Sequence, residues 1–484
     1  MKKTFISNLI LLTSVNLLIK PFWILGIDRG VQNYVGYEQY GIYSGLMAFS
    51  LLLITLLDLG INTYVSSNVA KNPDKLKDEF IPLTGFKLAS AVIYVIVTLI
   101  LGKLNGFDSY RIQLLLFLSF NQILSFFYIY FRSIIGGLQL FRIDAILSVV
   151  DRILMIVFCG LMLWTSFLEM SIERFIYAQT IAYSLAISAT LLVLKTKLVD
   201  LKFKFNLPQL KQVLKQMFPY ALLSLIMTFY TRMDAVLLPK LLIDGDYQNG
   251  VYASAYRLLE ASNMMAAMVS MLLLPIFSKM ISEKENLSSL VQLCTGIMII
   301  PAITLSYSAF LYRDELMHVM FPRSDAFAGE VFGVVILSFI PLAGMYVYGT
   351  LLTASAEMKI LNILAIIALI INLLINFTMI PEHKALGAAW ATLITQGFIG
   401  ISNFIFGKQK LNLQFEKGFS VNFLLSTSLL LVGAYFIKTM LSNWLTGVLC
   451  ISLLAVSLMI IFRIIKLKES LLLLRNQLDK RSNK

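Results

Sequence analysis

The sequence predicts an all-α integral membrane protein with about 14 transmembrane helices. Hydrophobic residues make up 58% of its 484 residues, charged residues only 14%, and the mean hydropathy is +0.80. A soluble domain carries about 25% charged residues. This chain therefore has too few charges to cover a water-facing surface, and long apolar segments recur along its whole length.

Fourteen segments are long and apolar enough to span the bilayer, because a helix needs about 20 apolar residues to cross a hydrocarbon core of ~30 Å. They lie at residues 8–28, 40–66, 85–102, 111–136, 144–165, 172–194, 217–238, 250–275, 290–311, 331–355, 360–380, 385–407, 420–438 and 443–463. The first follows two lysines, as a signal peptide does. It has no A-x-A cleavage site and it contains Lys20-Pro21, so we expect it to be retained.

The distribution of Lys and Arg orients these spans. With the N-terminus in the cytoplasm, the net charge is +15 in the cytoplasmic segments, −3 in the external loops and +1 within the spans. The positive-inside rule therefore predicts a multi-pass protein of the inner (plasma) membrane with both termini cytoplasmic. Each basic residue near the anionic inner leaflet gains about 1 kcal/mol, so the overall charge of +13 requires no nucleic-acid partner. We expect the basic tail after Arg463 to form a short amphipathic helix on the inner surface.

The longest cytoplasmic loop divides the chain into two lobes. We predict an N-terminal lobe of six spans (1–194), a basic cytoplasmic linker (195–216), a C-terminal lobe of six spans (217–407), and two extra spans with a basic tail (408–484). These boundaries follow the loop lengths and the charges.

An internal repeat supports the two lobes. Asp28 aligns with Asp234, and Gly41-Ile42-Tyr43-Ser44 aligns with Gly250-Val251-Tyr252-Ala253. Both copies lie at the outer end of a span in the same orientation, so the repeat is parallel. Parallel repeats place a substrate path between two lobes related by a pseudo-two-fold axis along the membrane normal.

Ionisable residues within the spans are the candidate functional groups, because a mid-bilayer Arg, Lys or Asp costs about 2.5–3.5 kcal/mol. Such residues must face protein, water or one another. Nine lie more than two residues from the end of a predicted span: Lys20, Asp58, Arg132, Asp151, Arg152, Arg232, Asp234, Arg257 and Glu260.

Lys20 lies about 18 Å along the first span, at 1.5 Å per residue. That depth is too great for its ammonium to reach either surface. The following Pro21 removes a backbone hydrogen bond and predicts a bend. Lys20 is interpreted as lining a central cavity, and the alternative is a buried ion pair with an acid on a neighbouring helix.

The other charges allow structural and functional interpretations side by side. Arg232 is equally suited to a cavity or to packing, whereas Asp234, about 200° away around the helix, suits a cap or a cross-helix partner. Arg257 and Glu260 are spaced i,i+3 and can pair. Asp58 is either a packing residue beside Gly60 or a proton or sodium site.

Charges near the inner ends of the fourth and fifth spans favour a structural role. We expect Arg132, Asp151 and Arg152 to form inter-helix salt bridges or to contact lipid headgroups.

Four stretches resemble a known family. They are Leu57-Asp58-Leu59-Gly60 in the second span, FPYALLSLIMTFYTRMD ending the seventh, NGVYASAYRLLE opening the eighth, and NLLINFTMIPEHKALGAAWAT across the eleventh and twelfth. Over about residues 5–405 the chain resembles the bacterial polysaccharide transporters, the O-antigen (oligosaccharide-lipid) flippases of the multidrug/oligosaccharidyl-lipid/polysaccharide exporter superfamily. The two extra spans resemble fourteen-span members, which include the lipid II flippases.

The resemblance implies that spans 1, 2, 7 and 8 face the cleft between the lobes. A polyprenyl-pyrophosphate head is anionic and suits a clamp of Lys and Arg. The candidate clamp residues are Lys20, Arg232 and Arg257, and the candidate ion-coupling residue is Asp58. Tyr43 and Tyr252 are candidates for stacking on sugars, with anchoring at the membrane interface as the alternative.

The sequence therefore predicts a flippase that exports a polyprenyl-pyrophosphate-linked oligosaccharide for O-antigen (lipopolysaccharide), capsule or exopolysaccharide synthesis. The chain has no phosphate-binding loop and no loop large enough for an ATPase domain, so we expect alternating access driven by the membrane potential or an ion gradient. The alternatives are a lipid II flippase and a cation-coupled multidrug antiporter of the same fold, which favours an acidic cavity.

A membrane enzyme acting on lipid-linked sugars is a further alternative from another class. The short external loops offer only His318 and His383, so we expect no catalytic residue. Cys159, Cys294 and Cys450 lie far apart, which predicts neither a metal site nor a disulfide framework, and we expect no cofactor. The expected partners are the lipid-linked oligosaccharide, the phospholipid membrane and a polysaccharide polymerase, and the protein is expected to be a monomer.

Overall fold

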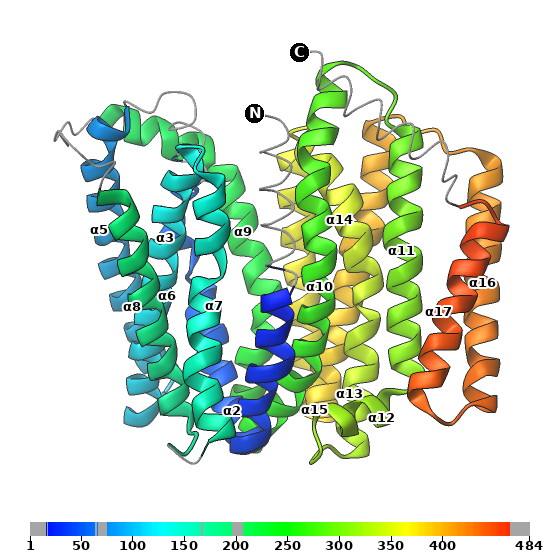
Figure 1. The fold of residues 1–484 in the computed structure, drawn as a ribbon, viewed down its shortest axis with the longest axis horizontal. Coiled ribbons are helices and arrows are strands. Elements are labelled where there is room, and N and C mark those ends of the chain that lie inside the picture. The colour runs from blue at the N-terminus through cyan, green and yellow to red at the C-terminus, as the bar shows by residue number, and fades with distance from the viewer. Residues whose placement is uncertain are drawn as a thin grey trace. The chain divides into compact units, whose positions relative to one another are not determined.

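The computed structural model describes residues 16, 18–62, 65, 75–165, 168–195 and 207–464, and in these residues the regular structure is entirely helical. The chain forms two compact units, Met1–Ala253 and Ser254–Lys484, and Figure 1 shows the helices of each. Eleven of the described helices are long and apolar enough to cross a membrane. The predicted all-α membrane fold is confirmed.

The first unit holds the helices drawn from blue to green in Figure 1. They are η1 (Trp23–Asp28), α2 (Arg29–Leu52), α3 (Thr55–Asp58), α5 (Lys75–Leu104), α6 (Ser109–Gly137), α7 (Phe141–Trp164), α8 (Ile172–Lys195), α9 (Leu207–Leu241) and the start of α10 (Gly245–Ser282). Within this unit α6 packs against α8 and α2, and α9 packs against α2. Buried side chains of α5, α6, α7 and α8 form one apolar core.

Three interruptions shape the first two predicted spans. The segment after Pro21 is a π-helix, as expected where a proline removes a helical hydrogen bond. Gly36, with φ +85°, separates the first span from the second inside α2. Leu59 (φ 47°) and Gly60 (φ 85°) then interrupt the second span directly after α3.

The second unit continues α10 and adds seven helices. They are α11 (Ser288–Leu311), α12 (Arg313–Met320), α13 (Ala326–Leu337), α14 (Phe339–Ala354), α15 (Met358–Lys410), α16 (Lys417–Met440) and α17 (Trp444–Ile461). Within α15, Lys384 has a non-helical backbone (φ 53°, ψ −132°) shortly after Pro381. This kink separates the predicted eleventh and twelfth spans, which α15 carries together.

The twelve predicted spans from 85–102 to 443–463 coincide with the eleven long apolar helices. The numbers differ by one because α15 contains two of the predicted spans. The first two predicted spans correspond to η1, α2 and α3 with their flanking residues. Residues 8–15 of the first span, residues 196–206 of the basic linker and the predicted tail helix after 464 lie outside the described residues. The two lobes predicted on either side of the linker stay a prediction.

Candidate functional site

Lys20 belongs to a cluster of charges inside the first unit. It is half-buried, and its electrostatic neighbours are Arg152, Asp151 and Arg132. Asp151 is 7% exposed, and its Oδ2 lies 3.4 Å from Nε of Arg152. Within the described part of the chain, the other carboxylate oxygen of Asp151 has no hydrogen-bond partner. The cluster therefore combines a buried acid with three nearby cations.

Arg132 and Arg152 are each fixed by a second contact. Nε of Arg132 on α6 lies 2.9 Å from Oδ1 of Asp144 on α7, which is the inter-helix salt bridge predicted for this arginine. The guanidinium of Arg152 lies 5.5 Å from the centre of the Trp23 ring. The three cations of this cluster thus lie among the carboxylates of Asp144 and Asp151, and Asp28 also acts electrostatically on Arg152. The role of Lys20 as a pyrophosphate ligand stays a prediction.

Asp58 lies at the interruption of the second span, where it is paired with Lys87 of α5. The ammonium of Lys87 lies 3.2 Å from Oδ1 of Asp58 and donates to the Leu57 carbonyl and to Oδ1 of Asn62, both at 3.1 Å. Oδ1 of Asp58 also accepts the Asn62 backbone N–H at 3.1 Å. A helix break leaves backbone groups without helical partners. Here the charged pair supplies those partners.

Sequence reasoning missed Lys87. This lysine is 1% exposed and lies 5.2 Å from the centre of the Tyr130 ring. It lies only two residues inside the cytoplasmic end of the predicted span 85–102, where a lysine is ordinarily expected to reach the membrane surface. The spacing of Asp58 and Lys87 in the chain carries no signal of their pairing. The role of Asp58 in ion coupling stays a prediction.

The two aligned aspartates of the repeat have matching environments. Asp28 (3% exposed) accepts a hydrogen bond of 2.8 Å from the Tyr40 hydroxyl, and Asp234 (1% exposed) accepts one of 2.9 Å from Tyr252. Asp234 on α9 thus has the cross-helix partner predicted for it. Buried carboxylates require such donors.

Tyr43 and Tyr252, the predicted sugar-stacking residues, are both 3% exposed. The Tyr43 hydroxyl accepts a hydrogen bond of 3.1 Å from Gln179. In this conformation both rings pack in the protein core, so stacking on a sugar requires a conformation in which they are uncovered. Their role in sugar binding stays a prediction.

The two predicted clamp arginines belong to different units. Arg232 is half-buried on α9 in the first unit. Arg257 lies on α10 in the second unit and is bonded to Glu260 at 2.5 Å, with the i,i+3 spacing that predicted this pair. The structure thus places Lys20 and Arg232 in one unit and Arg257 in the other, and their clamp role stays a prediction.

The chain matches a family model and several solved structures. A model described as polysaccharide biosynthesis protein matches residues 5–281. A search of the curated proteins found no match. Among solved structures, the chain is similar to the lipid II flippase MurJ in an inward closed conformation, with a TM-score of 0.73 and 16% identity over 94% of this chain and 98% of that one.

Two further similar structures belong to the MOP superfamily. One is a multidrug resistance MATE transporter in an inward-facing conformation, with a TM-score of 0.63, 16% identity, and coverage of 84% of this chain and 94% of that one. The other is a transporter from Pyrococcus furiosus whose binding pocket has reverse polarity, with a TM-score of 0.53, 13% identity, and coverage of 84% and 94%. These likenesses show a shared multi-pass transporter fold. Because the family model matches more than half of the sequence, this chain belongs to the polysaccharide biosynthesis protein family.

Proposed function

We propose that this protein is an inner-membrane flippase that exports a polyprenyl-pyrophosphate-linked oligosaccharide for a cell-surface polysaccharide such as O-antigen, capsule or exopolysaccharide. The observation that carries this proposal is the group of three neighbouring cations, Lys20, Arg132 and Arg152, inside a member of the polysaccharide biosynthesis family. Charge inside a membrane is costly and is kept for function. A pyrophosphate diester supplies the matching anion.

The sign of the buried charge separates this proposal from multidrug transport. A cavity that exports organic cations needs acidic groups, whereas the predicted spans of this chain carry a net charge of +1. The Pyrococcus furiosus superfamily member, whose reverse-polarity pocket suggests a different function for that protein, offers a parallel. The Lys20 cluster supports an anionic substrate here.

A lipid II flippase is the second candidate. The MurJ structure covers 94% of this chain, whereas the two MOP superfamily structures cover 84%. The sequence predicts two spans beyond the two lobes, which α16 and α17 supply. Lipid II also presents a pyrophosphate, so the two candidates share the clamp and differ in the glycan.

Export takes place by alternating access of the two lobes, 1–194 and 217–407, with both termini cytoplasmic. A charge that moves across 100 mV gains about 2.3 kcal/mol. Two negative charges leaving a negative-inside cell therefore gain about 4–5 kcal/mol, which is sufficient to drive export. An ion gradient coupled through Asp58 is the alternative. The protein acts as a monomer without a catalytic step and delivers its cargo to a polysaccharide polymerase.

The test is flipping in liposomes. The purified protein is reconstituted with a labelled polyprenyl-pyrophosphate oligosaccharide or lipid II under an imposed potential, and flipping is measured by exposure of the label to an external reagent. We expect potential-dependent flipping that falls at least tenfold in Lys20→Ala and Arg232→Ala. Lys359→Ala, which removes an exposed lysine of α15, is the matched control. Export of an organic cation without flipping of any glycan lipid contradicts the proposal.

A further inference from the structure

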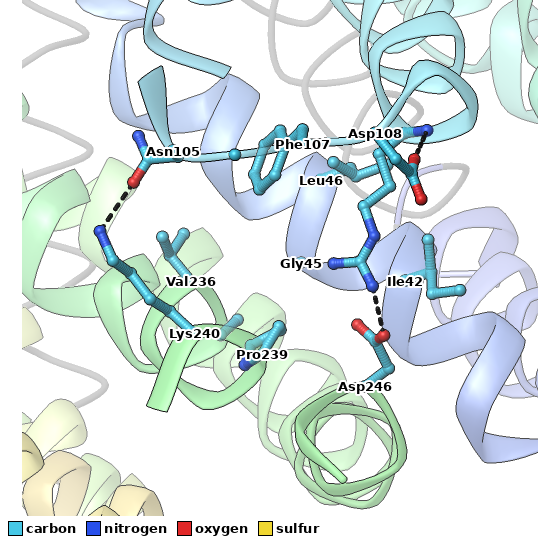
Figure 2. A pocket seen from close by; sticks show the side chains of 13 residues that line it. Ile42, Gly45, Leu46, Asn105, Phe107, Asp108, Val236, Pro239, Lys240 and Asp246 are labelled. Carbon is cyan, nitrogen blue, oxygen red and sulfur yellow. Dashed lines mark hydrogen bonds and ion pairs between the residues drawn. The ribbon is translucent and has the colours of Figure 1, made fainter. Parts of the chain in front are cut away.

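A pocket of about 380 Å³ opens within the first unit, away from the Lys20 cluster. Figure 2 shows its lining side chains, which come from α2, the connection between α5 and α6, the end of α9 and the first turn of α10. The predicted topology places this end of the unit outside the cell. Ligand pockets of proteins span about 300–1,000 Å³, so this one accommodates a small ligand or one end of a larger one.

The polar groups around the pocket are held in place by contacts between distant parts of the chain. Nη2 of Arg111 lies 2.6 Å from Oδ2 of Asp246, and Nζ of Lys240 donates to Oδ1 of Asn105 at 2.9 Å. Both bonds are drawn in Figure 2. Asp108 caps α6 by accepting the Arg111 backbone N–H at 2.8 Å. These groups are therefore pre-positioned on helix ends.

Both donors and acceptors remain for a ligand. The Lys240 ammonium has three N–H groups and the Arg111 guanidinium has five, and each gives one to its partner. Oδ1 of Asp246 is buried without a hydrogen-bond partner among the described residues. The second carboxylate oxygen of the exposed Asp108 is a further acceptor.

The charges of the side chains that line the pocket cancel. Two cations, Arg111 and Lys240, stand against two carboxylates, Asp108 and Asp246. An anionic or cationic ligand meets as much repulsion as attraction in such a site. Neutral hydroxyl groups, which both donate and accept, match it fully.

One wall of the pocket is apolar. It is made by Ile42, Leu46, Phe107, Val236 and Pro239. The Phe107 ring is held edge-on against Phe49, with the ring centres 5.1 Å apart. A pyranose has an apolar C–H face beside a rim of hydroxyls, and it therefore matches both the apolar wall and the polar groups.

We propose that this pocket binds one or two neutral sugar units at the outer end of the first unit. The inference rests on the proposed export of a glycan lipid and deepens it: the pocket recognises the glycan, whereas the buried cations recognise the pyrophosphate. Specificity for the glycan is then divided between two places in the same unit.

The test is binding of the purified full-length protein, in detergent, to an array of neutral and anionic oligosaccharides. We expect the wild type to bind neutral glycans and Lys240→Ala and Asp108→Asn to bind them at least tenfold more weakly. Asn still caps α6, so the second variant leaves the start of the helix in place while it removes the charge and replaces the free acceptor by an N–H donor. Lys103→Ala, which removes an exposed lysine two residues before the lining residue Asn105, is the matched control and keeps wild-type binding.

Three array results overturn the proposal: no binding of neutral glycans by the wild type, binding of anionic glycans only, or equal binding by the pocket variants. The two changed side chains are exposed, and size-exclusion profiles verify that the variants fold. Flipping is measured in parallel. If the wild type binds glycans through the pocket but flips no glycan lipid, the proposed function fails and the pocket stands. If the wild type flips the glycan lipid but the pocket variants bind the array as well as the wild type does, the proposed sugar pocket is wrong and the proposed function stands.

Discussion

Gly41 of α2 and Gly250 of α10 lie where these two helices cross within the first unit. A Cβ on Gly41 would lie 1.8 Å from the Asp246 carbonyl oxygen, and one on Gly250 would lie 1.9 Å from that of Tyr37. Side-chain amides then bond the two glycine carbonyls: Asn249 donates to Gly41 at 2.7 Å and Gln32 donates to Gly250 at 2.9 Å. The two glycines are the aligned positions of the internal repeat, so the repeat contacts itself.

Replacing either glycine by alanine should weaken this crossing. Gly41→Ala and Gly250→Ala must push the backbones apart, and overpacking of this kind costs about 1–3 kcal/mol. Thermal unfolding of the purified protein in detergent measures the loss. Gly85→Ala, at an exposed helical position with no atom near the added Cβ, is the control and should be neutral or stabilising. Equal melting temperatures for all three variants would show that the helices separate freely here.

Lys87→Met should destabilise the protein because it leaves the Asp58 carboxylate without its cation. Removing one partner of a buried ion pair costs about 3–5 kcal/mol, and the cost here is smaller because the Asp58 side chain is 25% exposed. The double variant Lys87→Met/Asp58→Asn should regain part of that stability. Thermal unfolding of the two single variants and the double variant measures the coupling. Strict additivity of the two changes would contradict the pairing.

Tyr40→Phe and Tyr252→Phe should each cost about 1.5–3 kcal/mol, the range for a hydrogen bond to a charged group. Each variant removes the hydroxyl group that donates a hydrogen bond to a buried aspartate, and it leaves the ring in place. Chemical or thermal unfolding in detergent is the measurement. Tyr220→Phe, at an exposed position, should leave stability unchanged. A loss of stability in only one of the two variants would show that the two hydrogen bonds, although alike in geometry, contribute differently to the free energy of unfolding.

Lys20→Ala distinguishes the two interpretations of this lysine. Its neighbours include two arginines, and Asp151 is already paired with Arg152, so removing Lys20 relieves repulsion. We expect unchanged or slightly raised thermal stability together with the loss of flipping. Asp151→Asn, in contrast, removes the carboxylate that is paired with Arg152 and should destabilise the protein by about 3–5 kcal/mol. A comparable loss of stability in Lys20→Ala would make Lys20 a structural ion-pair partner.

The features that depend on local periodicity could be predicted from the amino-acid sequence. Spans of about 20 apolar residues are set by the thickness of the bilayer, and 12 of the 14 coincide with the eleven long helices. The Arg257–Glu260 pair follows from the helical repeat and is present at 2.5 Å. The boundary predicted between spans 360–380 and 385–407 lies at the non-helical backbone of Lys384. Each of these signals lies within one helix.

Which helices meet, and at what depth, depends on how the helices pack in three dimensions. Lys87 is 29 residues from Asp58, and Arg111 is 135 residues from Asp246. These pairs depend on the rotation of each helix about its axis and on its position along the membrane normal, neither of which hydropathy specifies. The burial of Tyr43 and Tyr252 and the pocket beside Lys240 depend on the same two variables. Hydropathy places a residue in the membrane, whereas packing selects its partner.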